Sequence, residues 1–171
     1  GEFSFRRNIL PELRISSDWG IEIGILSEMQ RNFSPQNICQ VDLADTYDHK
    51  HQDLSLDDEK KGLSRMSTDI IKTFIKKLAT QGHSFSREQL RSLKATYYRS
   101  ALDLIDAYRA DAQMNGLIFD SHTEEKAVEL FSSNIIRAGE DFYLNPMDAP
   151  FIPTWSRVKS AIPDFLIRLE K

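Results

Sequence analysis

The chain has 171 residues, of which 40% are hydrophobic and 28% charged, and its formal net charge is −4. That length allows one domain with a hydrophobic core, and no apolar run approaches the roughly 20 residues that span a bilayer. The acidic balance disfavours nucleic acid as a partner, because phosphate backbones are bound by clustered Lys and Arg. Cys39 is the only cysteine, so no internal disulfide can form and a reducing cytoplasm is the expected location.

The first part of the chain predicts two helices and one strand. Residues 3–13 favour a short helix, and the polar run Ser16–Asp18 is suited to cap a second helix that starts near Trp19. Further along, Ile38–Leu43 alternates apolar and polar residues, which is typical of a strand. A single strand cannot pair its own backbone groups, and no second strand is evident. We therefore expect the sheet partners of this strand to lie outside the chain.

The rest of the chain is predicted to be helical. A first helix begins at residue 57 or 64 and ends at residue 81, before a glycine. The capping-box patterns Ser86–Gln89 and Ser121–Glu124 open two long helices. The first is expected to stop at Asn115-Gly116 and the second to end before Asn145-Pro146. A final helix covers residues 154–171, with a kink expected at its internal proline.

These elements predict a mainly α fold with one or two short β-strands. We divide the chain at residue 56. Residues 1–56 hold the strand and the polar loop that follows it, whereas residues 57–171 form a helical subdomain.

The densest group of polar side chains lies in the loop Asp42–Gln52, directly after the predicted strand. Loops at the carboxyl ends of strands commonly hold ligands in α/β enzymes. The two imidazoles of this loop, His49 and His51, and its three carboxylates suit a divalent cation, and the Lys50 ammonium suits a phosphate. The alternative is a solvated polar loop without a ligand.

Two further groups could carry chemistry. Glu22 stands among apolar residues near the start of a predicted helix, where it is either a site carboxylate or a group that complements the helix dipole. The run Asp120–Glu125 contains His122, but its interpretation as a helix cap is well supported by the capping-box pattern.

Five stretches, in the same order along nearly the whole chain, carry a resemblance to one family: Gly1–Phe3, Asp18–Leu26, Ile38–Gln52, Asn115–Glu125 and Trp155–Asp164. Together they resemble the glucosyl-3-phosphoglycerate synthases and their mannosyl relatives. The motifs Trp-Gly-x-Glu-Ile-Gly and Tyr-Asp-His-Lys-His-Gln are the most specific part of this resemblance.

The resemblance implies the carboxyl-terminal part of a glycosyltransferase A-type α/β fold. The family transfers glucose from a nucleoside-diphosphate glucose to 3-phosphoglycerate, with retention at the anomeric carbon and with Mg²⁺ or Mn²⁺, in the synthesis of glucosylglycerate, a compatible solute. Its nucleotide-binding half, with an Asp-x-Asp motif, has no counterpart in these residues. We therefore expect the chain alone to be inactive.

The resemblance also implies roles for individual residues. His49 matches the metal-ligating histidine, and Glu22 matches a catalytic carboxylate near the donor sugar. The residues that match substrate-binding positions, together with the phosphate-binding lysine inferred from the loop, are Trp19, Lys50, His51, Gln52, Gly1 and Glu2. Tyr47 stands where some members of the family have an arginine.

Residues 64–144 carry more apolar side chains than one exposed layer of helices can bury, which predicts a homodimer. The competing interpretation is that these side chains form only the internal core of the helical subdomain. For the chain as a whole, the alternative function is a self-contained helical interaction or dimerisation module without catalysis.

Overall fold

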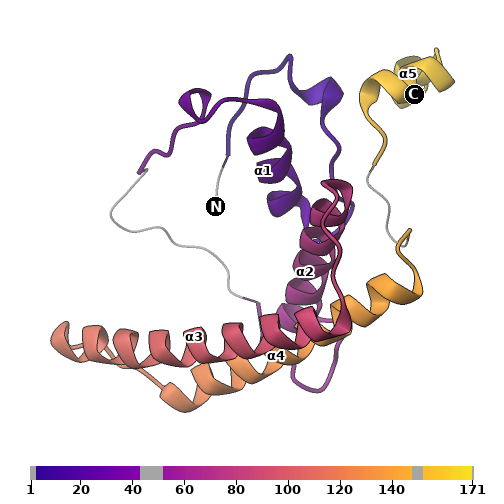
Figure 1. The fold of residues 1–171 in the computed structure, drawn as a ribbon. Helices are drawn as coiled ribbons and strands as arrows, with labels where there is room; N and C mark the ends of the chain where they lie inside the picture. The colour runs from indigo at the N-terminus through magenta and orange to yellow at the C-terminus, as the bar shows by residue number, and fades with distance from the viewer. Residues whose placement is uncertain (1–2, 43–51, 148–151, 171) are drawn as a thin grey trace. The chain divides into compact units, whose positions relative to one another are not determined.

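A computed structural model describes residues 3–42, 52–147 and 152–170 (Figure 1). Over these ranges the chain is mainly α-helical, as the sequence predicts. Its contacts group the residues into two compact units, Gly1–Asp45 with Ala149–Lys171, and Thr46–Asp148. The division after residue 56 concerns function and stays a prediction.

The first unit is built from short elements: the 3₁₀ helix η1 (Leu10–Glu12), α1 (Ile21–Asn32), the 3₁₀ helix η2 (Pro35–Asn37), α5 (Trp155–Ala161) and α6 (Phe165–Leu169). The expected helix over residues 3–13 is therefore only one 3₁₀ turn. α5 packs against η1, and the Ser156 hydroxyl donates a hydrogen bond to Glu12. An isolated antiparallel bridge joins the same regions, because the Ile152 N–H donates to the Ile15 carbonyl at 2.8 Å.

The start of α1 lies two residues beyond the predicted position near Trp19. Asp18 does not cap the helix. Its Oδ1 instead accepts from the Gly20 N–H at 2.9 Å and from the Ser16 hydroxyl at 2.6 Å. These two bonds form a turn that leads into the helix, and Gly20 becomes an N-cap without a side-chain hydrogen bond.

The prediction of a strand over Ile38–Leu43 is wrong for its described residues. Ile38 to Asp42 carries no strand, and Leu43 lies outside the described residues. Alternation alone cannot make a strand, because its backbone groups need a neighbouring segment. None pairs with Ile38–Asp42 in the described part of the chain, and Val41 is 68% exposed.

The predicted helix over residues 154–171 is broken rather than kinked. α5 ends at Ala161 and α6 begins at Phe165, with Pro163 between them. Proline lacks the N–H that a continuous helix requires, and its ring clashes with the preceding turn. The rings of Trp155 and Phe165 pack with 5.6 Å between their centroids, so the two helices stay together across the break.

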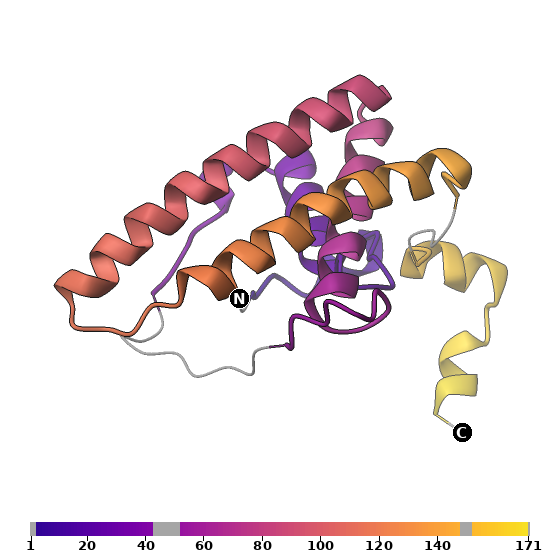
Figure 2. The ribbon, with the colours of Figure 1, turned by 90° about the horizontal axis from the view of Figure 1, so that it is seen from below.

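The second unit consists of three helices, α2 (Gly62–Thr80), α3 (Arg87–Met114) and α4 (Ser121–Leu144). α2 and α3 both pack against α4, and α3 and α4 lie side by side along most of their length (Figures 1 and 2). Among the described residues of this unit, the buried apolar side chains are Ile75, Leu90, Ile105, Ala112, Val128, Ile135 and Ala138.

The predicted capping box of α3 is confirmed. The Ser86 hydroxyl accepts from the Gln89 N–H at 3.2 Å, and the Gln89 side-chain oxygen accepts from the Ser86 N–H at 2.7 Å. Gly82 and Gly116 follow α2 and α3 with φ of +89° and +67°. Both helices thus end at the predicted glycines, in a conformation that glycine adopts without strain.

The predicted capping box of α4 is wrong by one residue. Asp120, not Ser121, is the N-cap, and its Oδ1 accepts from the N–H groups of His122 at 3.1 Å and Thr123 at 3.4 Å. An ionised carboxylate satisfies these N–H groups and also complements the helix dipole. Ser121 therefore becomes the first residue of the helix.

Among the described helices, none is long and apolar enough to cross a membrane.

Candidate functional site

Two of the predicted site residues lie at the start of α1 in the first unit. Trp19 occupies the turn before the helix with 44% of its surface exposed. Glu22 is exposed in the first turn of the helix. The local chain thus presents an indole and a carboxylate, one helical turn apart in sequence, at a solvent-accessible helix start. Such a pair could contact the ring and the hydroxyl groups of a sugar.

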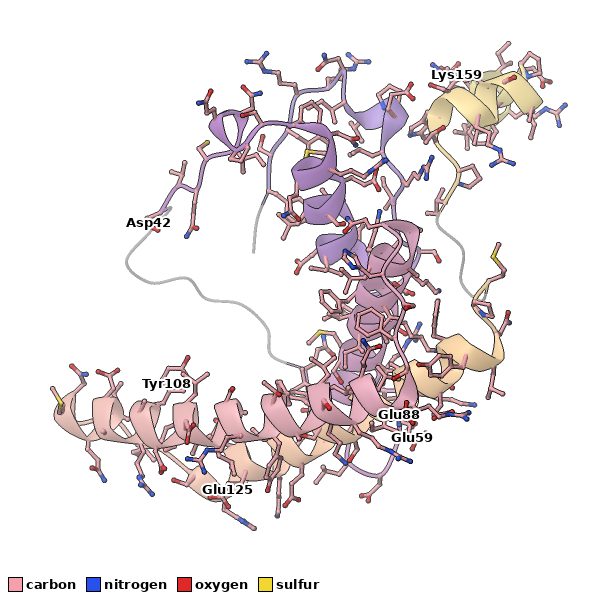
Figure 3. The ribbon with its side chains drawn as sticks, viewed as in Figure 1. Asp42, Glu59, Glu88, Tyr108, Glu125 and Lys159 are labelled. Carbon is pink, nitrogen blue, oxygen red and sulfur yellow. The ribbon has the colours of Figure 1, made fainter. Side chains whose placement is uncertain are left out.

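The other predicted residues belong to the segment around the polar loop and to the first two positions of the chain. Gln52, the last residue of the polar loop, is described and exposed, and it belongs to the second unit. The remaining predicted site residues lie outside the described residues: Gly1, Glu2, His49, Lys50 and His51. Their roles stay predictions. Asp42, the first residue of the polar loop, is described and is labelled in Figure 3.

A divalent cation needs several oxygen or nitrogen ligands close together. Within residues 3–42, 52–147 and 152–170, no three His, Cys, Asp or Glu side chains are grouped so that they could hold a metal ion. The predicted ligand His49 is outside these ranges. Mg²⁺ and Mn²⁺ prefer carboxylate, carbonyl and water oxygens, so an imidazole would be one ligand beside several oxygens.

The third sequence candidate, Asp120–Glu125, is a helix cap. The Thr123 hydroxyl donates to Asp120 Oδ2 at 2.6 Å, and this bond, with those of the backbone N–H groups, lowers the pKa of Asp120 below its ordinary value. His122 is exposed beside this cap. The structural interpretation of this run is therefore confirmed.

The structure shows how the chain is fixed directly after Gln52, which the sequence pattern did not indicate. The Asp53 carbonyl accepts from the Leu63 N–H at 2.8 Å, so residues 53–63 form a closed loop at the start of α2. Gly62 closes this loop with φ of +52°, and a Cβ there would lie 2.2 Å from the Asp53 oxygen. Only glycine fits that position without displacing the backbone.

A side chain from α4 holds the same loop. Arg137 places Nη1 2.9 Å from Glu59 Oε1, and its Nη2 lies 2.6 Å from Thr68 Oγ1 and 3.2 Å from Ser64 Oγ. Glu59, labelled in Figure 3, belongs to the loop, whereas Ser64 and Thr68 belong to the first turns of α2. One guanidinium thus joins three segments of the second unit.

Asn134 supports this arrangement one turn earlier on α4. Its side-chain nitrogen donates to the Ser64 carbonyl at 3.1 Å and to the Ser67 hydroxyl at 2.6 Å. Asn134 and Ser64 are 1% and 0% exposed. Buried polar groups are costly unless they are hydrogen-bonded, so this cluster fixes how α2 and α4 pack together.

A second polar contact joins the start of α3 to the end of α4. The Arg87 guanidinium makes two bonds to Glu140, at 2.9 and 3.0 Å, and lies 5.7 Å from the centroid of the Tyr143 ring. The Tyr143 hydroxyl donates to the Phe85 carbonyl. This pairing lowers the pKa of Glu140 and raises that of Arg87.

Two curated proteins, both named glucosyl-3-phosphoglycerate synthase, are similar to this chain. The protein of Persephonella marina (strain DSM 14350 / EX-H1) is 40% identical over 169 residues, which are 99% of this chain and 42% of that protein. The protein of Methanococcoides burtonii (strain DSM 6242 / NBRC 107633 / OCM 468 / ACE-M) is 39% identical over 170 residues, 99% of this chain and 41% of that protein. No protein-family model and no solved structure matches.

The chain thus spans about two-fifths of the length of these relatives and matches their carboxyl-terminal part. Both relatives are glycosyltransferases. The resemblance to the glucosyl-3-phosphoglycerate synthases is therefore confirmed along essentially the whole chain, beyond the five stretches that first indicated it.

Proposed function

We propose that this chain is the carboxyl-terminal part of an enzyme that transfers glucose from a nucleoside-diphosphate glucose to 3-phosphoglycerate, with retention at the anomeric carbon, for glucosylglycerate synthesis. The observation that carries the proposal is the identity of 40% and 39% to two proteins of that name over 99% of the chain. The relatives do not favour the alternative of a non-catalytic helical module.

In this proposal the chain supplies the groups that surround the reacting sugar and the acceptor. Trp19 and Glu22 would contact the donor glucose, with the exposed carboxylate accepting hydrogen bonds from sugar hydroxyls. The Lys50 ammonium would bind the acceptor phosphate, and His51 and Gln52 would hydrogen-bond phosphate oxygens. His49 would hold Mg²⁺ or Mn²⁺, and such an ion stabilises a diphosphate leaving group.

We also propose that the enzyme is cytoplasmic and that it forms a homodimer. A cytoplasmic enzyme fits the single cysteine, and a homodimer fits the apolar surface of α3. Leu104 and Tyr108 stand four residues apart on that helix, which places them on one face, and they are 51% and 58% exposed (Tyr108 in Figure 3). A second copy of the chain would cover this face.

The proposed metal ligand His49 can be compared with His122 in an enzyme that contains both this chain and a nucleotide-binding half. We expect His49→Ala to lower kcat at least 100-fold, the usual order for a lost transition-state contact, because a metal ligand is removed. His122→Ala should change kcat little, because His122 lies beside a helix cap. Steady-state kinetics at saturating Mg²⁺ measure both, and equal losses would contradict the assignment.

A further inference from the structure

We propose that Arg137 is a positioning residue, which holds the segment that follows Gln52 against α2 and so fixes where the Gln52 side chain meets its substrate. This inference rests on the proposed function, in which Gln52 binds substrate. It concerns a residue 85 positions further along the chain than Gln52, on a different helix. None of the motifs that carry the family resemblance contains Arg137.

The backbone next to Gln52 is anchored to the start of α2. Asp53 is bonded through its carbonyl to the Leu63 N–H, one of the N–H groups that a helix start leaves without a partner. Lys61, the N-cap of α2, provides no side-chain cap. The Asp53 carbonyl therefore takes the place of that cap, and the position of Gln52 follows the position of the first turn of α2.

Arg137 bonds both that first turn of α2 and the loop formed by residues 53–63. Ser64 and Thr68 are 0% and 7% exposed, so the bonds that Arg137 makes to them are shielded from water. The Glu59 side chain is 70% exposed, and the ion pair by itself contributes little to stability. Its effect is on geometry, because it fixes the middle of a loop whose two ends are already joined.

These contacts require an arginine. A guanidinium is a planar fork whose two terminal nitrogens donate in different directions. Here Nη1 bonds the loop at Glu59 and Nη2 bonds α2 at Thr68. A lysine ammonium is a single point charge, and at this position it could keep one of the two partners.

The alternative is that Arg137 only stabilises the packing of α2 on α4. The two roles are separated by Glu59, since this exposed residue bonds Arg137 through its side chain. Its removal leaves the buried bonds to Ser64 and Thr68 in place. Glu125, an exposed residue of α4 (Figure 3), offers the matched control of the same residue type.

The test compares Glu59→Ala, Arg137→Lys and Glu125→Ala in the complete enzyme, with kcat and KM measured for both substrates. We expect Glu59→Ala and Arg137→Lys to raise KM for at least one substrate about fivefold, the equivalent of one lost hydrogen bond. The unfolding midpoint of Glu59→Ala should equal that of the wild type, and Glu125→Ala should change neither quantity. An unchanged KM in Glu59→Ala would overturn the proposal, as would an equal rise in Glu125→Ala.

A second readout does not depend on activity. In the 171-residue chain, amide hydrogen exchange at Leu63 reports the bond to Asp53, and it should be faster in Glu59→Ala and Arg137→Lys than in the wild type. Unchanged exchange in both variants would show that Arg137 does not hold the loop. If the wild-type enzyme transfers no glucose, the proposed function fails, whereas faster exchange would still identify Arg137 as the residue that fixes the loop.

Discussion

At the scale of the residue, Gly139 of α4 packs closely against Leu90 of α3. A Cβ on Gly139 would lie 2.3 Å from Leu90 Cδ1, and Leu90 itself is 2% exposed. We expect Gly139→Ala to lower the free energy of unfolding by about 1–3 kcal/mol, because the overpacked leucine must leave its rotamer or separate the helices. Chemical denaturation measures this loss. Ser133→Ala, at an exposed position of the same helix, should change stability far less, and an equal effect would contradict the packing argument.

The pair of Arg87 and Glu140 predicts a dependence of stability on pH. Because pairing lowers the pKa of Glu140 in the folded chain, its contribution is present above the ordinary pKa of a glutamate, about 4.3, and is lost as the pH falls through the lowered value. Glu140→Gln should therefore be less stable than the wild type at pH 7. Thermal unfolding at pH 7 and pH 3 tests this, and a difference that persists undiminished at pH 3 would contradict it.

The sequence predicted the site residues by motif, but it could not predict Arg137, the residue that we propose positions Gln52. Trp19, Glu22 and Gln52 were predicted from the resemblance, and all three are accessible to a ligand. Arg137 was missed because its hydrogen-bond partners Thr68 and Ser64 lie 69 and 73 positions earlier. No pattern within one helix carries that information.

At the scale of the element, signals that act within a few residues predicted several helix boundaries. The capping box of α3 and the terminal glycines of α2 and α3 stand where the sequence placed them. Predictions failed where two local signals competed, as at Asp120 and Ser121, or where a partner segment was required, as for Ile38–Leu43. A strand is a property of at least two segments, whereas a helix satisfies most of its own backbone groups.

The start of α4 allows the corrected cap to be tested against the predicted one. Asp120→Ala removes the oxygen that accepts from the N–H groups of His122 and Thr123, and should lower the stability of the chain. Ser121→Ala should leave stability nearly unchanged, because Ser121 is the first helical residue. As a reference, Ser86→Ala should cost about 1 kcal/mol at the intact capping box of α3. A larger loss for Ser121→Ala than for Asp120→Ala would restore the original prediction.

At the scale of the whole molecule, the proposed homodimer depends on the apolar face of α3. Part of the apolar surface that the sequence attributed to a dimer is buried within the second unit, at Ile75, Ile105 and Ile135. Leu104 and Tyr108 are exposed and stay available for a second copy. Sedimentation equilibrium at micromolar concentration should give a dimer for the wild type and a lower association constant for Leu104→Glu. A monomeric wild type would leave only the internal-core interpretation.

We propose that these residues complete a glucosyltransferase whose nucleotide-binding half they do not contain. The most direct measurement is the formation of glucosyl-3-phosphoglycerate from 3-phosphoglycerate and a nucleoside-diphosphate glucose, with Mg²⁺ or Mn²⁺, by the 171-residue chain and by the enzyme that joins it to a nucleotide-binding half. We predict product from the joined enzyme and none from the chain alone. Product from the chain alone, or its absence from the joined enzyme with each common nucleotide donor, would contradict the account.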